Sequence, residues 1–163
     1  MTVAAHPSVE QLLPRRSPMV LIGRLAEASE QEGTCEVPIT PQPMFPKAAG
    51  VPTCVGVEYT AQSVATHGGY RRSLDNEPIA VGLLMGTRRS ETSCQFSGRR
   101  QTLRIHVSRR WGKLGFMRHR CAIASATTGT LFRQAELHVF KPKTVQSYLE
   151  GVGHDHSRTH QRG

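Results

Sequence analysis

The sequence predicts an α+β domain in which one long helix packs against an antiparallel sheet, and its 163 residues fit a single domain. Two patterns predict this class. Apolar and small residues spaced three and four apart predict a buried helix over about residues 53–70. Apolar runs and alternating patterns predict the strands that follow, at residues 79–87, 103–107, 116–126 and 131–140. The order of the strands in the sheet does not follow from these patterns.

The chain before the long helix predicts a short helix and two further strands. Ser8 is expected to cap the short helix, with Gln11 in the capping-box position and Pro14 after its end. The continuous apolar run at residues 19–22 predicts a buried strand, and residues 34–39 predict a second strand.

The turns and loops are marked by proline and glycine. Five of the ten prolines fall between residues 38 and 52, which excludes regular helix or central strand there and predicts a long loop where a site can form. Thr53 is the expected N-cap of the long helix, and the pair Gly68-Gly69 is expected to end it. Residues 127–130 predict a hairpin turn between the last two strands.

Positive charge is concentrated in one part of the chain. The net charge is +9, and residues 71–120 hold twelve Lys or Arg against three acids. Arginine pairs phosphate and carboxylate well, so the segment predicts either an acidic partner or a solvated basic surface. Nucleic acid is the weaker partner, because nine aromatic residues offer few stacking platforms and no helix-turn-helix signature is present.

The composition also bounds compartment and chemistry. The four cysteines lie far apart without C-x-x-C spacing, which favours reduced thiols over disulfides and predicts neither a metal site nor a cofactor. No apolar run approaches the roughly 18 residues of a membrane helix, and the first ten residues lack the order of a signal peptide. We therefore expect a cytoplasmic protein without a membrane partner.

Four ordered segments carry a resemblance to a known family. LLPRRSPMVLIGRL (residues 12–25) resembles the N-terminal signature of the β-hydroxyacyl-ACP dehydratases of the FabA/FabZ type, and VPTCVGVEYTAQ (residues 51–62) resembles their active-site helix. Residues 82–89 and 138–142 are similar to further motifs of the aryl-polyene-type, ApeP-like dehydratase subgroup.

The resemblance implies a hotdog fold, a long central helix wrapped by an antiparallel sheet, in one domain over residues 1–150. Residues 151–163 read as a disordered polar tail. The resemblance also implies a dimer, either a homodimer or a heterodimer with a paralogue, with active-site tunnels at the interface. The loop at residues 40–52 is expected to lie in that interface.

The implied reaction is the loss of water from a β-hydroxyacyl thioester carried by acyl carrier protein, in fatty-acid, polyketide or aryl-polyene biosynthesis. Glu58 aligns with the family's helix acid and is the predicted catalytic residue, since elimination needs a proton-transfer group. The predicted substrate-binding residues are Thr53, Cys54, Gln62, Met44 and Phe45. Gln62 follows Glu58 by one helical turn and shares its face, so it can orient the carboxylate.

Within the basic segment, Arg88 and Arg89 are the predicted contacts for the acidic carrier protein.

The sequence departs from the family pattern at the catalytic histidine. The His-Phe-Pro of the FabZ-type loop aligns with Met44-Phe45-Pro46, and Met cannot transfer a proton. The His of the family's L-P-H segment aligns with Arg15, which cannot act as a base. His67 is half a turn out of phase with Glu58 and is expected to point away from it, while His119 reads as a surface or structural residue.

Three functions from different classes therefore stay open: a dehydratase that works through Glu58, a catalytically degenerate hotdog subunit that binds acyl carrier protein or pairs with an active paralogue, and an acyl thioesterase that uses the helix acid to activate water.

Overall fold

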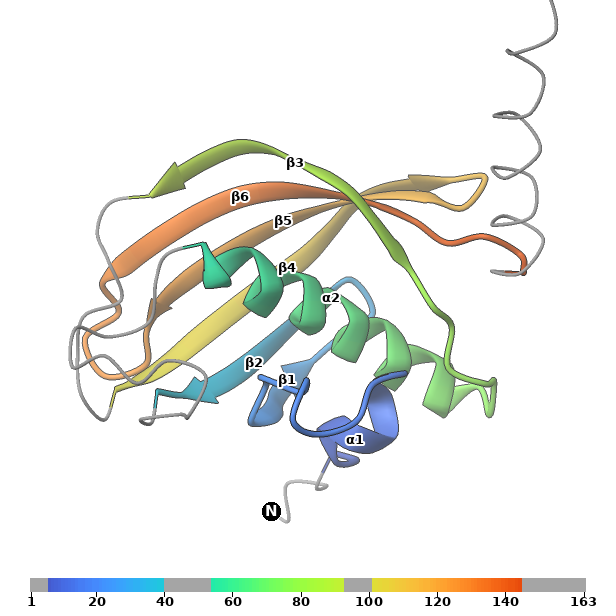
Figure 1. Cartoon of the computed structure of the whole chain (residues 1–163), viewed down its shortest axis with the longest axis horizontal. Coiled ribbons are helices and arrows are strands. Elements are labelled where there is room, and N and C mark those ends of the chain that lie inside the picture. The colour runs from blue at the N-terminus through green and yellow to red at the C-terminus, as the bar shows by residue number, and fades with distance from the viewer. Residues whose placement is uncertain (1–5, 40–53, 93–100, 145–163) are drawn as a thin grey trace, which may run out of the picture.

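The computed structural model describes residues 6–39, 54–92 and 101–144 as two helices and one sheet (Figure 1). The elements in chain order are α1 (Val9–Leu12), β1 (Arg24–Ala28), β2 (Glu32–Pro38), α2 (Val55–Leu74), β3 (Leu83–Thr92), β4 (Thr102–Lys113), β5 (Phe116–Ser125) and β6 (Leu131–Phe140). The six strands pair antiparallel in the order β1-β2-β4-β5-β6-β3. The sheet curves around α2, so the predicted α+β class is confirmed.

The core lies between α2 and the inner face of the sheet. The alternation predicted around residues 103–107 places Leu103, Ile105 and Val107 on that face, and each has none of its surface exposed. Ile105 stands opposite Ile123 of β5, and Val107 stands opposite Cys121, so the same face continues across the sheet. The predicted strands at residues 103–107, 116–126 and 131–140 are confirmed as parts of β4, β5 and β6.

Two local predictions, one on a helix cap and one on a hairpin turn, also hold. In α1 the Ser8 backbone N–H donates to Gln11 Oε1 at 3.0 Å, which is one half of the predicted capping box. Between β5 and β6 the Ser125 N–H donates to the Thr130 carbonyl at 2.9 Å. Gly129 supplies the positive φ of 71° that this turn needs.

The prediction of a strand at residues 19–22 is wrong. These residues form a loop, and the hydrogen bonds of its backbone go to a side chain on α2 instead of a neighbouring strand. The Leu21 N–H donates to Gln62 Oε1 at 2.8 Å, and Gln62 Nε2 donates to the Met19 carbonyl at 2.8 Å. The backbone of a partly buried apolar segment can therefore find hydrogen-bond partners without joining the sheet. The first strand is β1, which begins only at Arg24.

The prediction that Gly68-Gly69 ends the long helix is also wrong. Helix α2 has Cys54 as its N-cap and runs through both glycines to Leu74. Gly69 is required for a different reason: a Cβ there would overlap the Leu12 carbonyl oxygen, because α1 packs directly on this turn of α2. Thr53, the expected N-cap, lies outside the described residues.

The predicted strand at residues 79–87 is displaced along the chain. Residues 79–82 are irregular, and β3 runs from Leu83 to Thr92 at one edge of the sheet. Its only strand partner in the described sheet is β6.

The two glycines of α2 are expected to respond in opposite directions to alanine. A Cβ at Gly68 would have no atom within 4 Å, so Gly68→Ala is expected to raise the free energy of unfolding by about 0.5–1 kcal/mol. Gly69→Ala is expected to lower it by about 1–3 kcal/mol, through overlap with Leu12. Urea unfolding of the two variants and the parent protein measures both changes, and equal effects would contradict the packing of α1 on Gly69.

Candidate active site

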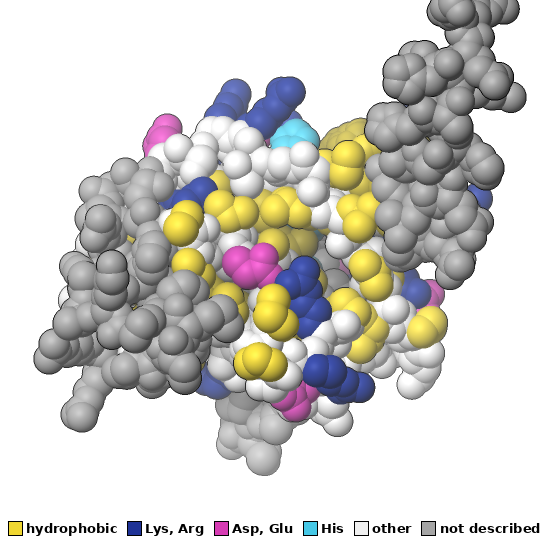
Figure 2. All heavy atoms as spheres, in the orientation of Figure 1, with side chains coloured by type: hydrophobic (Ala, Val, Ile, Leu, Met, Phe, Trp, Pro, Cys, Tyr) yellow, Lys and Arg dark blue, Asp and Glu magenta, His cyan; other side chains and the backbone are white. Residues whose placement is uncertain are grey.

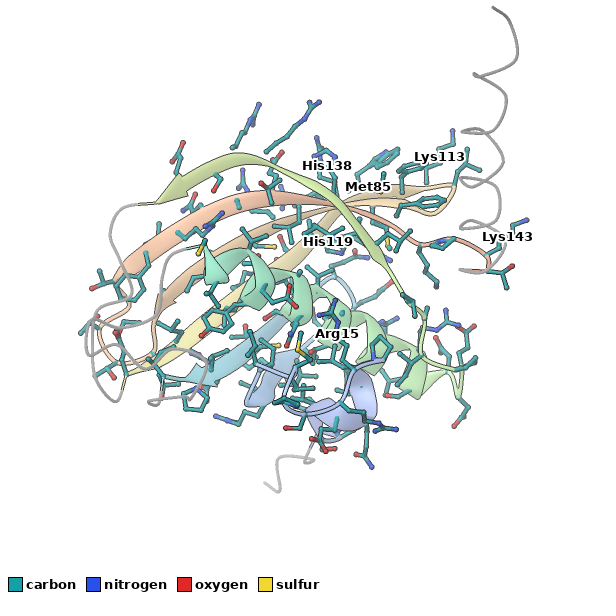
Figure 3. All side chains as sticks on the ribbon, in the orientation of Figure 1. Arg15, Met85, Lys113, His119, His138 and Lys143 are labelled. Carbon is teal, nitrogen blue, oxygen red and sulfur yellow. The ribbon has the colours of Figure 1, made fainter. Side chains whose placement is uncertain are left out.

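A cavity of about 340 Å³ lies along α2 and is lined by residues of α2, of the N-terminal segment and of strands β3, β4, β5 and β6. Its floor is made of small side chains on α2, Ala61, Ala65 and Gly68. Figure 2 shows hydrophobic side chains gathered on the face in view, with acidic and basic side chains in contact among them. The cavity has polar groups on both flanks of α2: in Figure 3, Arg15 lies beside the N-terminal segment and His119 on the side of the sheet.

Glu58 stands in the first turn of α2 and lines the cavity with a side chain 37% exposed. Arg15 Nη1 donates to Glu58 Oε1 at 2.9 Å, and Gln62 Nε2 donates to the same oxygen at 2.9 Å. In the described part of the chain no hydrogen bond reaches Oε2. The arrangement therefore fixes one carboxylate oxygen and leaves the other for a ligand.

Gln62 positions Glu58 and is itself held by hydrogen bonds to the N-terminal loop. Its side chain is almost completely buried, with 3% of the residue exposed. The carboxamide oxygen accepts the Leu21 N–H, while the nitrogen donates to the Met19 carbonyl and to Glu58. The sequence prediction that Gln62 lies beside Glu58 and orients it agrees with this geometry. Both N–H donors of its amide are used, and its role in substrate binding stays a prediction.

Of the other predicted site residues, the structure places Cys54, Arg88 and Arg89. Met44, Phe45 and Thr53 lie outside the described residues. Cys54 is exposed at the N-cap of α2. The carrier-protein contacts stay predictions: Arg88 and Arg89 are exposed on β3, outside the set of residues that line the cavity.

Arg15 is the site residue that the sequence prediction left out. The sequence signal that could have identified Arg15 is its alignment with the histidine of the family's L-P-H segment. In this structure the side chain at that position contacts the helix acid Glu58. Arginine supplies a permanent positive charge at Glu58, where the family pattern has a group that can exchange a proton.

Two histidines also line the cavity, against expectation. His119 is 4% exposed and His67 is 5% exposed, so of the two interpretations of His119, surface or structural, the surface one is wrong. The inward alternation of β5 is the signal that could have placed His119, since Cys121 and Ile123 continue it on the same face. His67 does leave α2 on the opposite side from Glu58, but the cavity spans both sides.

Burial determines the charge state of both imidazoles. It lowers the pKa of His67, whose Nε2–H donates to the Ser29 carbonyl at 2.9 Å. Burial also lowers the pKa of His119 to about 4, with further lowering by the nearby His67 and Arg109. Both rings are therefore neutral at pH 7.

We expect acid to destabilise the fold through His119. Its pKa is about 4 in the folded chain against 6.5 ordinarily, so the unfolded chain binds more protons below pH 6.5. The free energy of unfolding should fall by about 3 kcal/mol from this residue as the pH drops from about 6.5 to 4. His119→Leu should remove this contribution to the fall in the free energy of unfolding. Urea unfolding across this pH range measures it, and parallel curves for parent and variant would refute the assignment.

Neither a metal centre nor a membrane span is found in the described ranges. Residues 6–39, 54–92 and 101–144 contain no group of three or more His, Cys, Asp or Glu that could hold a metal ion. In the same ranges neither helix is both long and apolar enough to cross a bilayer.

The helix wrapped by an antiparallel sheet, with a carboxylate on the helix beside a cavity, defines a hotdog-fold protein. The dehydratase heterocomplex ApeI:P from Xenorhabdus doucetiae matches with a TM-score of 0.79 and 20% identity, over 90% of this chain and 97% of that chain. A hypothetical thioesterase from Streptococcus pneumoniae, solved with coenzyme A, matches with a TM-score of 0.57 and 9% identity, over 73% and 84% of the two chains. Mouse thioesterase superfamily member 2 gives a TM-score of 0.52 and 13% identity, over 72% and 80%.

The chain belongs to the ApeP-like family, whose model, described as ApeP dehydratase, matches residues 7–150. The resemblance predicted from the sequence motifs is thereby confirmed. A search of curated proteins finds no match.

Proposed function

We propose that this protein is a subunit of a 3-hydroxyacyl-[acyl-carrier-protein] dehydratase, which binds the β-hydroxyacyl thioester in the α2 cavity and uses Glu58 for proton transfer. The observation that carries the proposal is the carboxylate of Glu58, held by Arg15 and Gln62 through one oxygen at the wall of a 340 Å³ cavity. Membership of the ApeP-like family supports dehydration as the reaction, with aryl-polyene biosynthesis as its setting.

A single carboxylate can carry both proton transfers of the elimination. Glu58 Oε2 takes the proton from the carbon beside the thioester carbonyl, the electrons of that C–H bond form the new double bond, and the C–O bond to the hydroxyl breaks. The departing hydroxyl takes the proton back from Glu58 and leaves as water, so the carboxylate is restored. Helix α2 begins with backbone N–H groups that have no partner within the helix, and this is the positive end of its dipole. Both features favour the negative charge that develops on the thioester oxygen.

Pairing with a paralogue is part of the proposal because the described cluster has no histidine in contact with Glu58. A partner subunit of the same fold can supply a second acid-base group that shares the proton transfers with Glu58, and the heterocomplex of the related dehydratase from Xenorhabdus doucetiae supports such an arrangement. On this chain the edge strand β3 carries the exposed side chains Leu84 and Met85, which are 43% and 52% exposed. An edge strand with apolar side chains is suited to a protein partner.

The acidic acyl carrier protein is the proposed source of the substrate. Arg88 and Arg89 are exposed on the same edge strand and can attract it by charge, which raises the association rate and weakens with salt.

Replacing Glu58 tests the proposed chemistry. Glu58→Gln keeps the shape and removes the carboxylate, so dehydration of β-hydroxyacyl-carrier protein should fall by at least about 10²-fold. The assay follows the mass of the carrier-bound chain, with this protein alone and with a paralogous hotdog dehydratase encoded beside it. Glu27→Gln is the matched control, because Glu27 also pairs with an arginine, Arg104, at 2.6 Å, but lies on β1 outside the cavity.

The outcomes separate the three functions. Loss in Glu58→Gln and normal turnover in Glu27→Gln support the dehydratase. Release of the free acid from the carrier protein would indicate a thioesterase instead. A complex whose dehydration is unaffected by Glu58→Gln would leave this chain as a non-catalytic subunit.

Replacing Met85 tests the pairing. Met85→Glu puts a charge on an exposed apolar position of the edge strand and should weaken association by at least about tenfold, because the charge must be desolvated in an interface. Light scattering of the protein alone and mixed with the paralogue gives the mass of each species. Leu114→Glu is the control, since Leu114 is 85% exposed at the β4–β5 turn. A parent protein that stays monomeric in both samples would refute the pairing.

A further inference from the structure

The sheet-side wall of the cavity contains an unused hydrogen-bonding group. His119 is buried on the inner face of β5 and lines the cavity. Its Nδ1 is fully buried and has no hydrogen-bond partner among the described residues. A buried polar atom without a partner costs free energy. Because Nδ1 is closed off from the cavity, a ligand there can reach the ring only at Nε2, which is not among the buried unpartnered atoms.

His67 also lines the cavity, but one of its two ring nitrogens already makes a hydrogen bond. Its Nε2–H is committed to the Ser29 carbonyl, which leaves the neutral ring with a lone pair at Nδ1. It packs tightly beside Gly33, where an added Cβ would lie 3.0 Å from the His67 ring. The His67 ring is therefore fixed in place, and His119 is the ring with hydrogen-bonding capacity to spare.

The charged groups at this wall limit what can bind. Arg71, Arg109 and Glu30 also line the cavity, and Arg71 and Arg109 lie near the histidines. The Arg109 Nε–H donates a hydrogen bond to Gln31 Oε1 at 3.2 Å. The one ring nitrogen of neutral His119 that a ligand can reach makes a single hydrogen bond, which matches one uncharged oxygen group such as an amide or a hydroxyl. A carboxylate would need several donors at once.

We propose that His119 forms a ligand-binding subsite that hydrogen-bonds an uncharged oxygen-bearing group of the bound acyl-pantetheine, across α2 from Glu58. This inference rests on the proposed function, since it takes the ligand of the cavity to be an acyl thioester on a pantetheine arm. His67 acts as a positioning residue that packs beside the ring of His119.

Two parts of such a ligand carry the required chemistry. The pantetheine arm has two amides, and the acyl chain can bear an oxygen function distant from the thioester. The floor between Glu58 and the histidines is lined by Ala61, Ala65 and Gly68, which leave room for an extended chain to cross α2.

The test measures binding, so it does not depend on turnover. The probes are amide analogues of acyl-pantetheine: one with a short β-hydroxyacyl chain, one with a long unsubstituted chain, and one with a terminal hydroxyl on the same long chain. Calorimetry compares the parent protein with His119→Leu, which keeps the volume and removes both ring nitrogens. The expected loss is about tenfold in affinity, the worth of one uncharged hydrogen bond.

The pattern across the probes identifies the group that is bound. Equal loss for all three probes assigns the pantetheine amide, and loss confined to the hydroxyl-bearing probe assigns the acyl chain. His119→Asn should recover part of the affinity, because its amide still donates and accepts. His106→Leu is the control, since His106 is exposed on β4, where it contacts Thr34, and is outside the cavity lining.

Folding stability provides a second readout. A histidine kept for the fold would make His119→Leu less stable at pH 7, whereas a histidine kept for a ligand leaves that variant at least as stable as the parent, because an unsatisfied polar atom is removed. Unchanged affinity for every probe, or a loss of affinity that follows a loss of stability, would overturn the inference. A parent protein that binds none of the probes would overturn the proposed function as well, which distinguishes the two failures.

Discussion

The carboxamide of Gln62 is the connection on which the site depends. It makes the backbone hydrogen bonds of Met19 and Leu21 that a neighbouring strand would otherwise make, and it donates a hydrogen bond to one oxygen of Glu58. A second fixed point lies two turns further along α2, where α1 packs on Gly69. The N-terminal segment is therefore held to α2 at two places, and the chain between them carries Arg15 to Glu58. The position of the charged pair follows from packing and backbone hydrogen bonds and does not require the pair itself.

The Arg15–Glu58 pair contributes little to stability but much to the chemistry of the site. Its side chains are 50% and 37% exposed, and ion pairs of that exposure are screened by solvent and add little to folding. What the pair determines is the charge beside the carboxylate. A histidine at position 15 could give or take a proton there, whereas the guanidinium can only donate hydrogen bonds and attract negative charge. This is the physical reason for assigning proton transfer on this chain to Glu58 and for proposing a second proton-transfer group in a partner subunit.

The sequence predicted the parts of the fold that depend on periodicity. Alternation placed Leu103, Ile105 and Val107 on the inner face, and the spacing of small residues located α2. The failures have local causes that periodicity does not contain. The run at residues 19–22 looked like a strand because the partner of its backbone is a side chain forty residues later. Gly69 looked like a helix end because its role is to let another helix approach. The candidate site was predicted in part: Glu58 and Gln62 followed from motif and spacing, but the contact of Arg15 and the burial of His119 needed the tertiary structure.

The features that make the cavity are those that a sequence selected only for stability would avoid. Gly68 lies inside a helix with open space around it, where alanine has higher helix propensity. The Nδ1 atom of His119 is buried without a partner, where a leucine would pack without that cost. Each of these choices destabilises the folded chain by an amount comparable to a typical single substitution, and both occur around one cavity that also holds the family's helix acid. Local departures from the most stable choice are expected at binding sites. The cavity over α2, with Glu58 at one flank and His119 at the other, is therefore where these two choices agree better with the proposed ligand site than with the needs of the fold.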